Sequence, residues 1–91
     1  MSPIEALLRR LPSMNAVLED EEVRRRIAAE GWSRGFARQA AAVLLDRLRN
    51  EILAGDLDGG ELDVRLGSVA ADVMQTGAAM LRTRLRRVVN G

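Results

Sequence analysis

The stretch SRGFARQAAAVLLDRLRNEILAG, residues 33–55, decides the fold class of this chain. Ser33 is favoured at the start of a helix and Gly55 at its end, so the stretch predicts one helix between them. At 100° per residue, six apolar side chains fall in one broad arc, which is typical of the central helix of a small bundle. They are Phe36, Ala40, Val43, Leu44, Leu48 and Ile52. Arg47 and Glu51 lie near this arc and are spaced to pair with each other.

The residues before the central helix predict three shorter helical segments. Ser2 and Pro3 suit the start of a helix over roughly 3–10, which Pro12 interrupts. Ser13 can cap a second short segment. The residues of this second segment that we expect to face inward are Met14, Val17 and Leu18.

The third short segment is strongly charged. Residues 19–26 read EDEEVRRR, four acids followed by three arginines. This order suits the helix dipole, and Gly31 is a favourable residue to end the helix. The spacing predicts three pairs across one helical turn, namely Asp20–Arg24, Glu21–Arg25 and Glu22–Arg26. We therefore interpret this arginine run as a solvated face whose charges are paired within the helix.

A glycine-rich loop and a last helix follow the central helix. In residues 55–63, GDLDGGELD, Asp58 and Glu61 have the spacing of a capping box. Apolar residues of the next helix share an arc of about 60°. They are Leu62, Leu66, Val69, Val73 and Met80. Gly67 and Gly77 weaken this helix, and Gly77 is the expected place for a bend or an end. The chain is therefore predicted to be all-α, a small bundle of four to five helices with no sheet.

The amino-acid composition argues against an enzyme. The 91 residues include no histidine, cysteine, lysine or tyrosine, and all 14 basic residues are arginine. The commonest general base, the thiol nucleophile, the Schiff-base amine and the imidazole metal ligand are therefore absent. No apolar run approaches the roughly 20 residues of a membrane span. We expect no catalytic residue, no metal site and no membrane insertion in this chain.

The central helix carries the first candidate site for a polyanion. Arg34, Arg38 and Arg49 fall within about 60° of each other on this helix. Such a stripe can follow a phosphate backbone, because each guanidinium offers a two-pronged donor to phosphate oxygens. The competing interpretation is an ordinary hydrated helix face. The neighbouring Trp32 can stack on an RNA base. We favour a core position for it at the helix junction, because Phe36 is the one other aromatic residue in the chain and large aromatic side chains contribute most to core burial.

The end of the chain, RTRLRRVVNG (82–91), is the second candidate. No acid follows Asp72, so nothing nearby in sequence neutralises this segment. Its arginines are Arg82, Arg84, Arg86 and Arg87. The segment is either a polyanion-binding tail or a connector to further chain. The connector interpretation also accounts for a strand-like Val88-Val89 pair followed by the turn-forming Asn90-Gly91.

Three stretches resemble one protein family in the same order. LRRLPSMNAVLED (8–20), WSRGFARQAAAVLLDRLR (32–49) and LRRVVNG (85–91) are similar to bacterial selenocysteine synthase, the L-seryl-tRNA(Sec) selenium transferase. Positions in the second stretch that match the family pattern are Trp32, Arg34, Leu45, Asp46, Leu48 and Arg49. Ser33 stands where the family has glycine, Gly35 where it has an acidic residue, and Arg87 where it has proline.

The resemblance implies that residues 1–81 are a helical N-terminal tRNA-recognition domain and that 82–91 lead to an absent catalytic domain. The family is implied to be cytoplasmic, to assemble as a homodecamer, and to convert seryl-tRNA(Sec) to selenocysteinyl-tRNA(Sec) with pyridoxal phosphate on a lysine. Its N-terminal domain is implied to grip the D-arm of tRNA(Sec). Because this chain has no lysine, it cannot hold pyridoxal phosphate as a Schiff base.

A helical protein-interaction module is the alternative function. In that interpretation the helices dock on a catalytic domain or a neighbouring subunit, and the arginines pair with protein carboxylates rather than with RNA phosphates.

Overall fold

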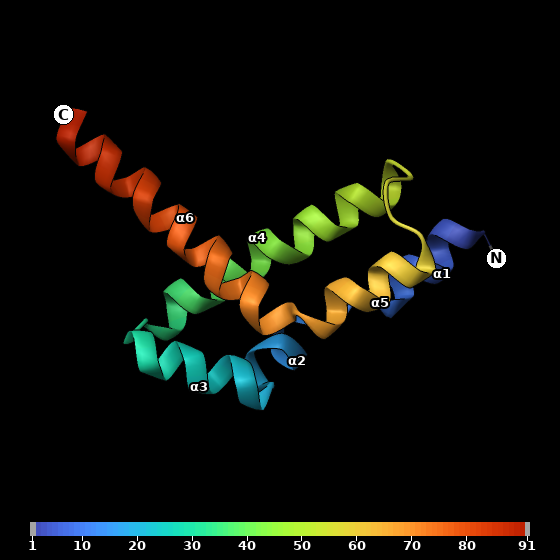
Figure 1. Ribbon diagram of the computed structural model, residues 1–91, viewed down its shortest axis with the longest axis horizontal. Coiled ribbons are helices and arrows are strands. Elements are labelled where there is room, and N and C mark those ends of the chain that lie inside the picture. The colour runs from blue at the N-terminus through green and yellow to red at the C-terminus, as the bar shows by residue number, and fades with distance from the viewer. Residues whose placement is uncertain (1, 91) are drawn as a thin grey trace.

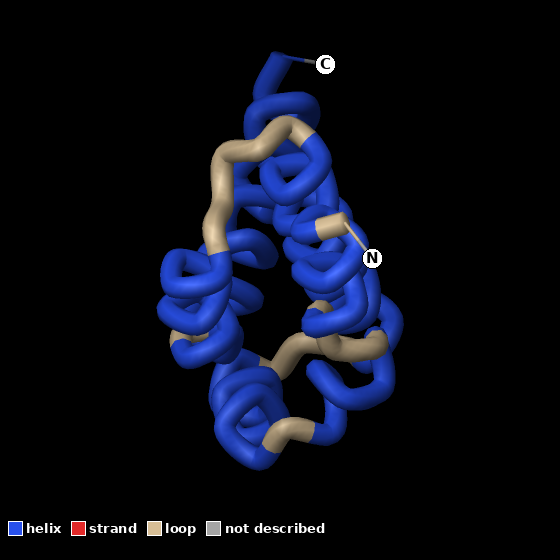
Figure 2. The backbone as a smooth tube through the Cα atoms, turned by 90° about the vertical axis from the view of Figure 1, so that its right-hand side faces the viewer, coloured by secondary structure: helices blue, strands red, loops and turns tan. Residues whose placement is uncertain are grey.

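The computed structural model describes the backbone of residues 2–90 and the side chains of residues 2–83. Six helices joined by short loops make up this part of the chain, and it contains no strand (Figure 1, Figure 2). They are α1 (Pro3–Arg10), α2 (Met14–Glu19), α3 (Glu21–Glu30), α4 (Arg34–Leu53), α5 (Gly59–Gly67) and α6 (Val69–Asn90). The predicted all-α fold is confirmed.

The helices form two layers. The molecule measures 47 × 31 × 18 Å, and its shortest dimension corresponds to two packed helices, whose axes usually lie about 8–10 Å apart. The main contact is between α4 and α6, which cross each other, while α2 and α1 also pack on α4 and α3 packs on α6. The last turns of α6 extend past the other helices (Figure 1). No helix within residues 2–90 combines the length and the apolar character needed to cross a lipid bilayer.

Side-chain caps fix where the helices begin. Ser13 Oγ accepts from Ala16 N at 3.0 Å, and Ser33 Oγ accepts from Phe36 N at 3.1 Å. Both are predicted caps, and each satisfies a backbone N–H that has no partner within its own helix. Ser2 caps α1 in the same way, Asp20 caps α3, and Asp58 forms a complete capping box with Glu61 at α5. Two predicted helix ends, Gly31 and Gly55, have φ of +70° and +80°, a region that favours glycine.

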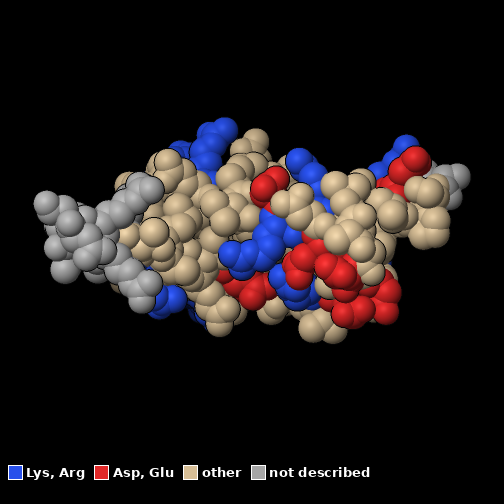
Figure 3. Space-filling model, turned by 90° about the horizontal axis from the view of Figure 1, so that it is seen from above, with Lys and Arg blue, Asp and Glu red and all other residues tan. Residues whose placement is uncertain are grey.

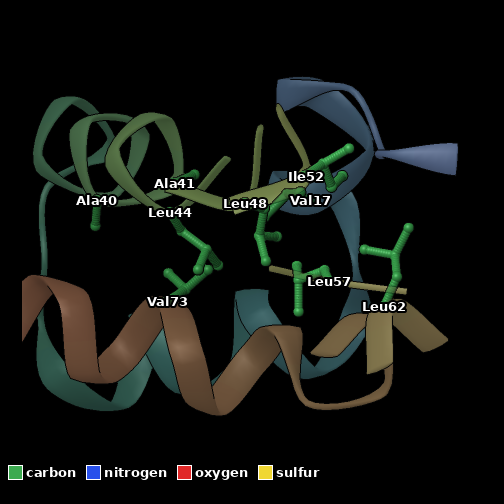
Figure 4. Close-up of a cluster of buried hydrophobic side chains, with 9 residues drawn as sticks. All are labelled: Val17, Ala40, Ala41, Leu44, Leu48, Ile52, Leu57, Leu62 and Val73. Atoms are coloured by element: carbon green, nitrogen blue, oxygen red, sulfur yellow. The ribbon is translucent and has the colours of Figure 1, made fainter. Parts of the chain in front are cut away.

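The core lies between α4 and the layer of α5 and α6 (Figure 4). Leu44, Leu48 and Ile52 of α4 are at most 1% exposed, and they lie with residues from α2, α5, α6 and the α4–α5 loop. The cluster consists of Val17, Ala40, Ala41, Leu44, Leu48, Ile52, Leu57, Leu62 and Val73. Burying one such large side chain contributes about 1.5–3 kcal/mol. The central role predicted for residues 33–55 is therefore confirmed.

The buried face of α4 is rotated from the predicted one. Val43 is 41% exposed, whereas Ala37 and Ala41 are buried. At 100° per residue, the buried arc runs about 120° from Ala40 to Ile52, and Val43 lies about 60° beyond its Ala40 edge. The sequence arc was broader than the surface that the neighbouring helices cover, so the inclusion of Val43 was wrong.

The last predicted helix is two helices. The break falls at Gly67 and Ser68, where the Ser68 hydroxyl lies within donating distance of the carbonyl oxygen of Arg65, at 3.2 Å, and of Asp72 Oδ2, at 3.3 Å. A serine side chain that bonds locally in this way competes with the regular backbone hydrogen bonds that would continue helix α5. The predicted bend or end at Gly77 is wrong, because α6 continues through this residue to Asn90. The strand-like interpretation of Val88-Val89 is wrong for the same reason.

Candidate nucleic-acid interface

Several arginines are engaged with acidic side chains and are poor candidates for binding an anion. Arg10 pairs with Asp63 and also donates to the carbonyl oxygen of Gly59 at 3.3 Å. Arg65 faces Glu51 through two atom pairs, Nη1 to Oε1 at 3.3 Å and Nη2 to Oε2 at 3.1 Å. These contacts hold α1 and α4 against α5. The predicted pairing of Arg47 with Glu51 is wrong, because Glu51 takes its partner from α5.

The charged helix α3 is paired differently from the prediction. Glu22 holds both Arg25 and Arg26, the latter with Nε 2.9 Å from Oε1. Asp20 is occupied as the cap of α3, where its Oδ1 accepts from Val23 N at 3.0 Å. Arg24 therefore forms no ion pair with any side chain in residues 2–83. The prediction that this face is self-paired is correct for Arg26 with Glu22, whereas Arg25 pairs with Glu22 rather than with the predicted Glu21, and the prediction is wrong for Arg24.

Arg24 lies on a groove that also contains two arginines of the predicted stripe. The groove lies between α2, α3 and the start of α4 and has a volume of about 640 Å³. Its lining residues are Asn15, Leu18, Glu19, Arg24, Ile27, Ala28, Trp32, Arg34, Ala37 and Arg38. Arg24, Arg34 and Arg38 are exposed and form no ion pair among the described side chains. Glu19 is the one acid in the lining, so the groove carries a net charge of about +2 at neutral pH.

Trp32 lines the groove and also packs against neighbouring helices. Its ring packs edge-to-face with Phe36, with the ring centroids 4.9 Å apart and the planes at 84°. The outer edge of its six-membered ring lies against Gly77 of α6. The residue is half-buried and lines the groove as well. Trp32 lies at the predicted helix junction, but it is half-buried rather than a core residue, and it lines the groove.

The other predicted residues lie outside the groove. Arg49 is exposed and borders a separate shallow hollow beside Pro12 and Asp46. It lies about 22 Å from Arg34 along α4, at 1.5 Å per residue. Arg82 is exposed on α6. The side chains of Arg84, Arg86 and Arg87 lie outside the described residues.

Charge is unevenly distributed over the surface. In Figure 3, acidic side chains gather mainly over the half of this face that is farther from the end of α6. Acids of the α4–α5 loop and α5 include Asp56, Asp58, Glu61 and Asp63, all exposed. The groove lies toward the opposite end of the bundle, where α3 meets the start of α4 (Figure 1). The arginines of the groove therefore lie apart from the acids of the α4–α5 loop and α5.

Comparison with known proteins finds a relative that matches this chain over most of its length. L-seryl-tRNA(Sec) selenium transferase from Geobacter sulfurreducens is 40% identical over 82 residues, which are 90% of this chain. The resemblance to L-seryl-tRNA(Sec) selenium transferase is therefore confirmed. The chain spans 17% of the length of this transferase. No model of a known protein family matches the chain, and no solved structure matches it.

Proposed function

We propose that this chain is the tRNA(Sec)-recognition domain of a longer selenocysteine synthase and that it recognises the D-arm of seryl-tRNA(Sec). The observation that carries the proposal is its 40% identity to a transferase whose name specifies seryl-tRNA(Sec). The arginines of α4 support an RNA-facing role, because Arg34, Arg38 and Arg49 are exposed and have no acidic partner among the described side chains.

The type of recognition follows from the side chains that α4 offers. Double-stranded RNA is read mainly by shape and by contacts to phosphates and 2′-hydroxyls, since its deep groove excludes side chains. Arginine suits this task because its planar guanidinium binds two phosphate oxygens at once. The stripe of Arg34, Arg38 and Arg49 would follow one strand, with Arg82, Arg84, Arg86 and Arg87 as a second contact near the end of α6.

Catalysis belongs to another part of the proposed longer protein. Pyridoxal phosphate, which serves as an electron sink when bound, needs a lysine amine for its Schiff base, and this chain has none. The residues present therefore do not fit that cofactor. In the proposal, residues 1–81 bind the tRNA, and 82–91 lead to a catalytic domain that assembles with its sister subunits into a decamer in the cytoplasm.

A titration of the chain with two RNAs tests the proposal. We expect the selenocysteine tRNA to bind more tightly than a serine tRNA, with an affinity that falls as salt rises. Fluorescence anisotropy of labelled tRNA at several salt concentrations measures both properties. Equal affinity for the two tRNAs would contradict D-arm recognition, and no binding at low salt would contradict RNA recognition by this chain.

A protein-interaction module remains the second candidate because large apolar side chains are exposed beside the acidic end. Val64 of α5 is 72% exposed and Leu53 at the end of α4 is 54% exposed. This function predicts that the chain binds the remaining part of a selenium transferase in a pull-down and that Val64→Ser weakens this binding. Binding that survives Val64→Ser but is lost on Arg34→Gln would place the contact on the arginine face instead.

A further inference from the structure

The groove between α2, α3 and α4 combines a cationic rim with an apolar interior. Arg24, Arg34 and Arg38 supply the charge, and Leu18 and Ile27 are half-buried along the wall. The three arginines come from two helices, so the arrangement exists only in the folded chain. A site of this composition suits a ligand with an anionic end and a flat, weakly polar body.

The aromatic side of the groove is held in place before any ligand arrives. Trp32 contacts the backbone of α6 at Gly77 and the ring of Phe36, and its backbone N–H donates to the carbonyl oxygen of Ile27 at 3.2 Å. A ring packed against two neighbours loses little conformational freedom when a ligand stacks on it. Trp32 is therefore preorganised for stacking.

The start of α4 adds to the positive potential at the same end. Ser33 caps the helix through Phe36 N, while the backbone N–H groups of Arg34 and Gly35 have no partner among the described residues. The first turn of a helix carries a partial positive charge that favours anions. At Gly35 no side chain covers the backbone, and nothing lies within 4 Å of the position a Cβ would take. This turn therefore supports the arginines in binding an anion.

The volume of the groove selects the size of the ligand. At about 640 Å³ it lies within the usual range of pockets for one small molecule, roughly 300–1,000 Å³. RNA-binding proteins read loop nucleotides by taking an unstacked base onto an aromatic or arginine side chain. Building on the proposed function, we infer that the groove holds one unstacked nucleotide of the bound RNA, its base against Trp32 and its flanking phosphates against Arg24, Arg34 and Arg38.

Trp32 gives a direct readout, because it is the one tryptophan in the chain. The first probes are the four nucleoside 5′-monophosphates, with the matching nucleosides and inorganic phosphate for comparison. We expect at least one monophosphate to quench Trp32 fluorescence more strongly than its nucleoside, and inorganic phosphate to compete without quenching. With saturating tRNA(Sec), acrylamide should quench Trp32 several-fold less efficiently than in the free protein.

Matched variants on α3 separate the groove from general charge effects. Arg24→Gln removes a groove arginine without an ion pair, whereas Arg25→Gln removes the neighbouring arginine, which is held by Glu22. Losing one charge-assisted bond to phosphate should weaken monophosphate binding about ten-fold for Arg24→Gln. For Arg25→Gln we expect a change of less than two-fold, because this residue does not line the groove.

Two results would overturn the inference. One is a Trp32 side chain as accessible to acrylamide with tRNA(Sec) bound as without it, and the other is an equal effect of the two variants. Both leave the proposed function standing if tRNA(Sec) still binds with salt-dependent affinity. Conversely, monophosphates that quench Trp32 in a chain that binds no tRNA would support the groove and contradict the proposed function.

Discussion

The indole of Trp32 occupies the space where a side chain at residue 77 would lie. A Cβ atom built on Gly77 would be 2.6 Å from Cζ3 of this ring and closer still to Cη2, well inside any normal carbon–carbon contact. Glycine lowers the stability of a helix interior, yet α6 continues through this position without ending. Gly77 is therefore needed because it lets the Trp32 ring approach α6 closely, and not because the helix bends there.

Gly77→Ala is expected to lower the free energy of unfolding. Overpacking costs about 1–3 kcal/mol, while alanine improves helix propensity by about 1 kcal/mol, so the steric cost dominates. The displaced indole should also shift its fluorescence emission. Urea denaturation followed by circular dichroism, together with the emission spectrum of Trp32, measures both effects.

Gly35→Ala is the matched control, because a methyl group at this helical position meets nothing within 4 Å. We expect it to stabilise the fold by about 0.5 kcal/mol through reduced freedom of the unfolded chain. If Gly77→Ala were as stabilising as Gly35→Ala, the contact between Trp32 and α6 would be too loose to account for the glycine.

The arginine stripe predicts a change in salt dependence. If Arg34, Arg38 and Arg49 each neutralise one phosphate, their combined replacement by Gln should flatten the slope of log affinity against log salt by about two units. The fold should be unchanged because all three side chains are exposed. Anisotropy titrations of tRNA(Sec) at four or more salt concentrations give the slope.

Arg25→Gln combined with Arg26→Gln is the control for the stripe, since both side chains are held by Glu22. Their loss should change the slope much less and cost α3 about 0.5 kcal/mol for each pair. A larger change in slope for this control than for the stripe would move the RNA contact from α4 to α3. If Arg82→Gln alone had the larger effect, the contact would lie on α6.

The contact between Glu51 and Arg65 predicts energetic coupling between α4 and α5. Both side chains are about one-third exposed, so screening by solvent reduces the coupling to about 1 kcal/mol. A double-mutant cycle of Glu51→Gln and Arg65→Gln in urea measures it. The same cycle with Arg47→Gln in place of Arg65→Gln should give a coupling near zero, and a larger value there would restore the pairing that sequence spacing predicts.

The capping box predicts a local loss of stability at the start of α5. Asp58 Oδ1 accepts from Glu61 N at 2.7 Å, and Asp58→Ala removes this bond and the favourable charge at the helix start. We expect a loss of about 1 kcal/mol in thermal or urea unfolding. Asp56→Ala, which removes an exposed acid of the same loop that caps no helix, should change stability by less than about 0.5 kcal/mol. Equal losses would point to loop charge rather than capping as the cause.

The sequence by itself determined the helical fold and most helix boundaries. A cap such as Ser13 or Ser33 bonds to an N–H three residues ahead, so its effect depends on neighbours that the sequence already specifies. The apolar spacing of residues 33–55 similarly identified the central helix. Helix periodicity shows which residues share a face of one helix, and this was enough to predict Leu44, Leu48 and Ile52 as core residues.

Only the tertiary structure decided which faces meet and which charges remain unpaired. Glu51 pairs with Arg65, 14 residues away, rather than with Arg47 one turn away, because the packing of α5 on the core brings Arg65 alongside. Residue 77 must be glycine because the ring of Trp32, from the α3–α4 junction, packs against it. Arg24 of α3 lies on the same groove as Arg34 and Arg38 of α4. Periodicity fixes angles within one helix but contains no information on the helix that will cover each face, so contacts between helices required the folded chain.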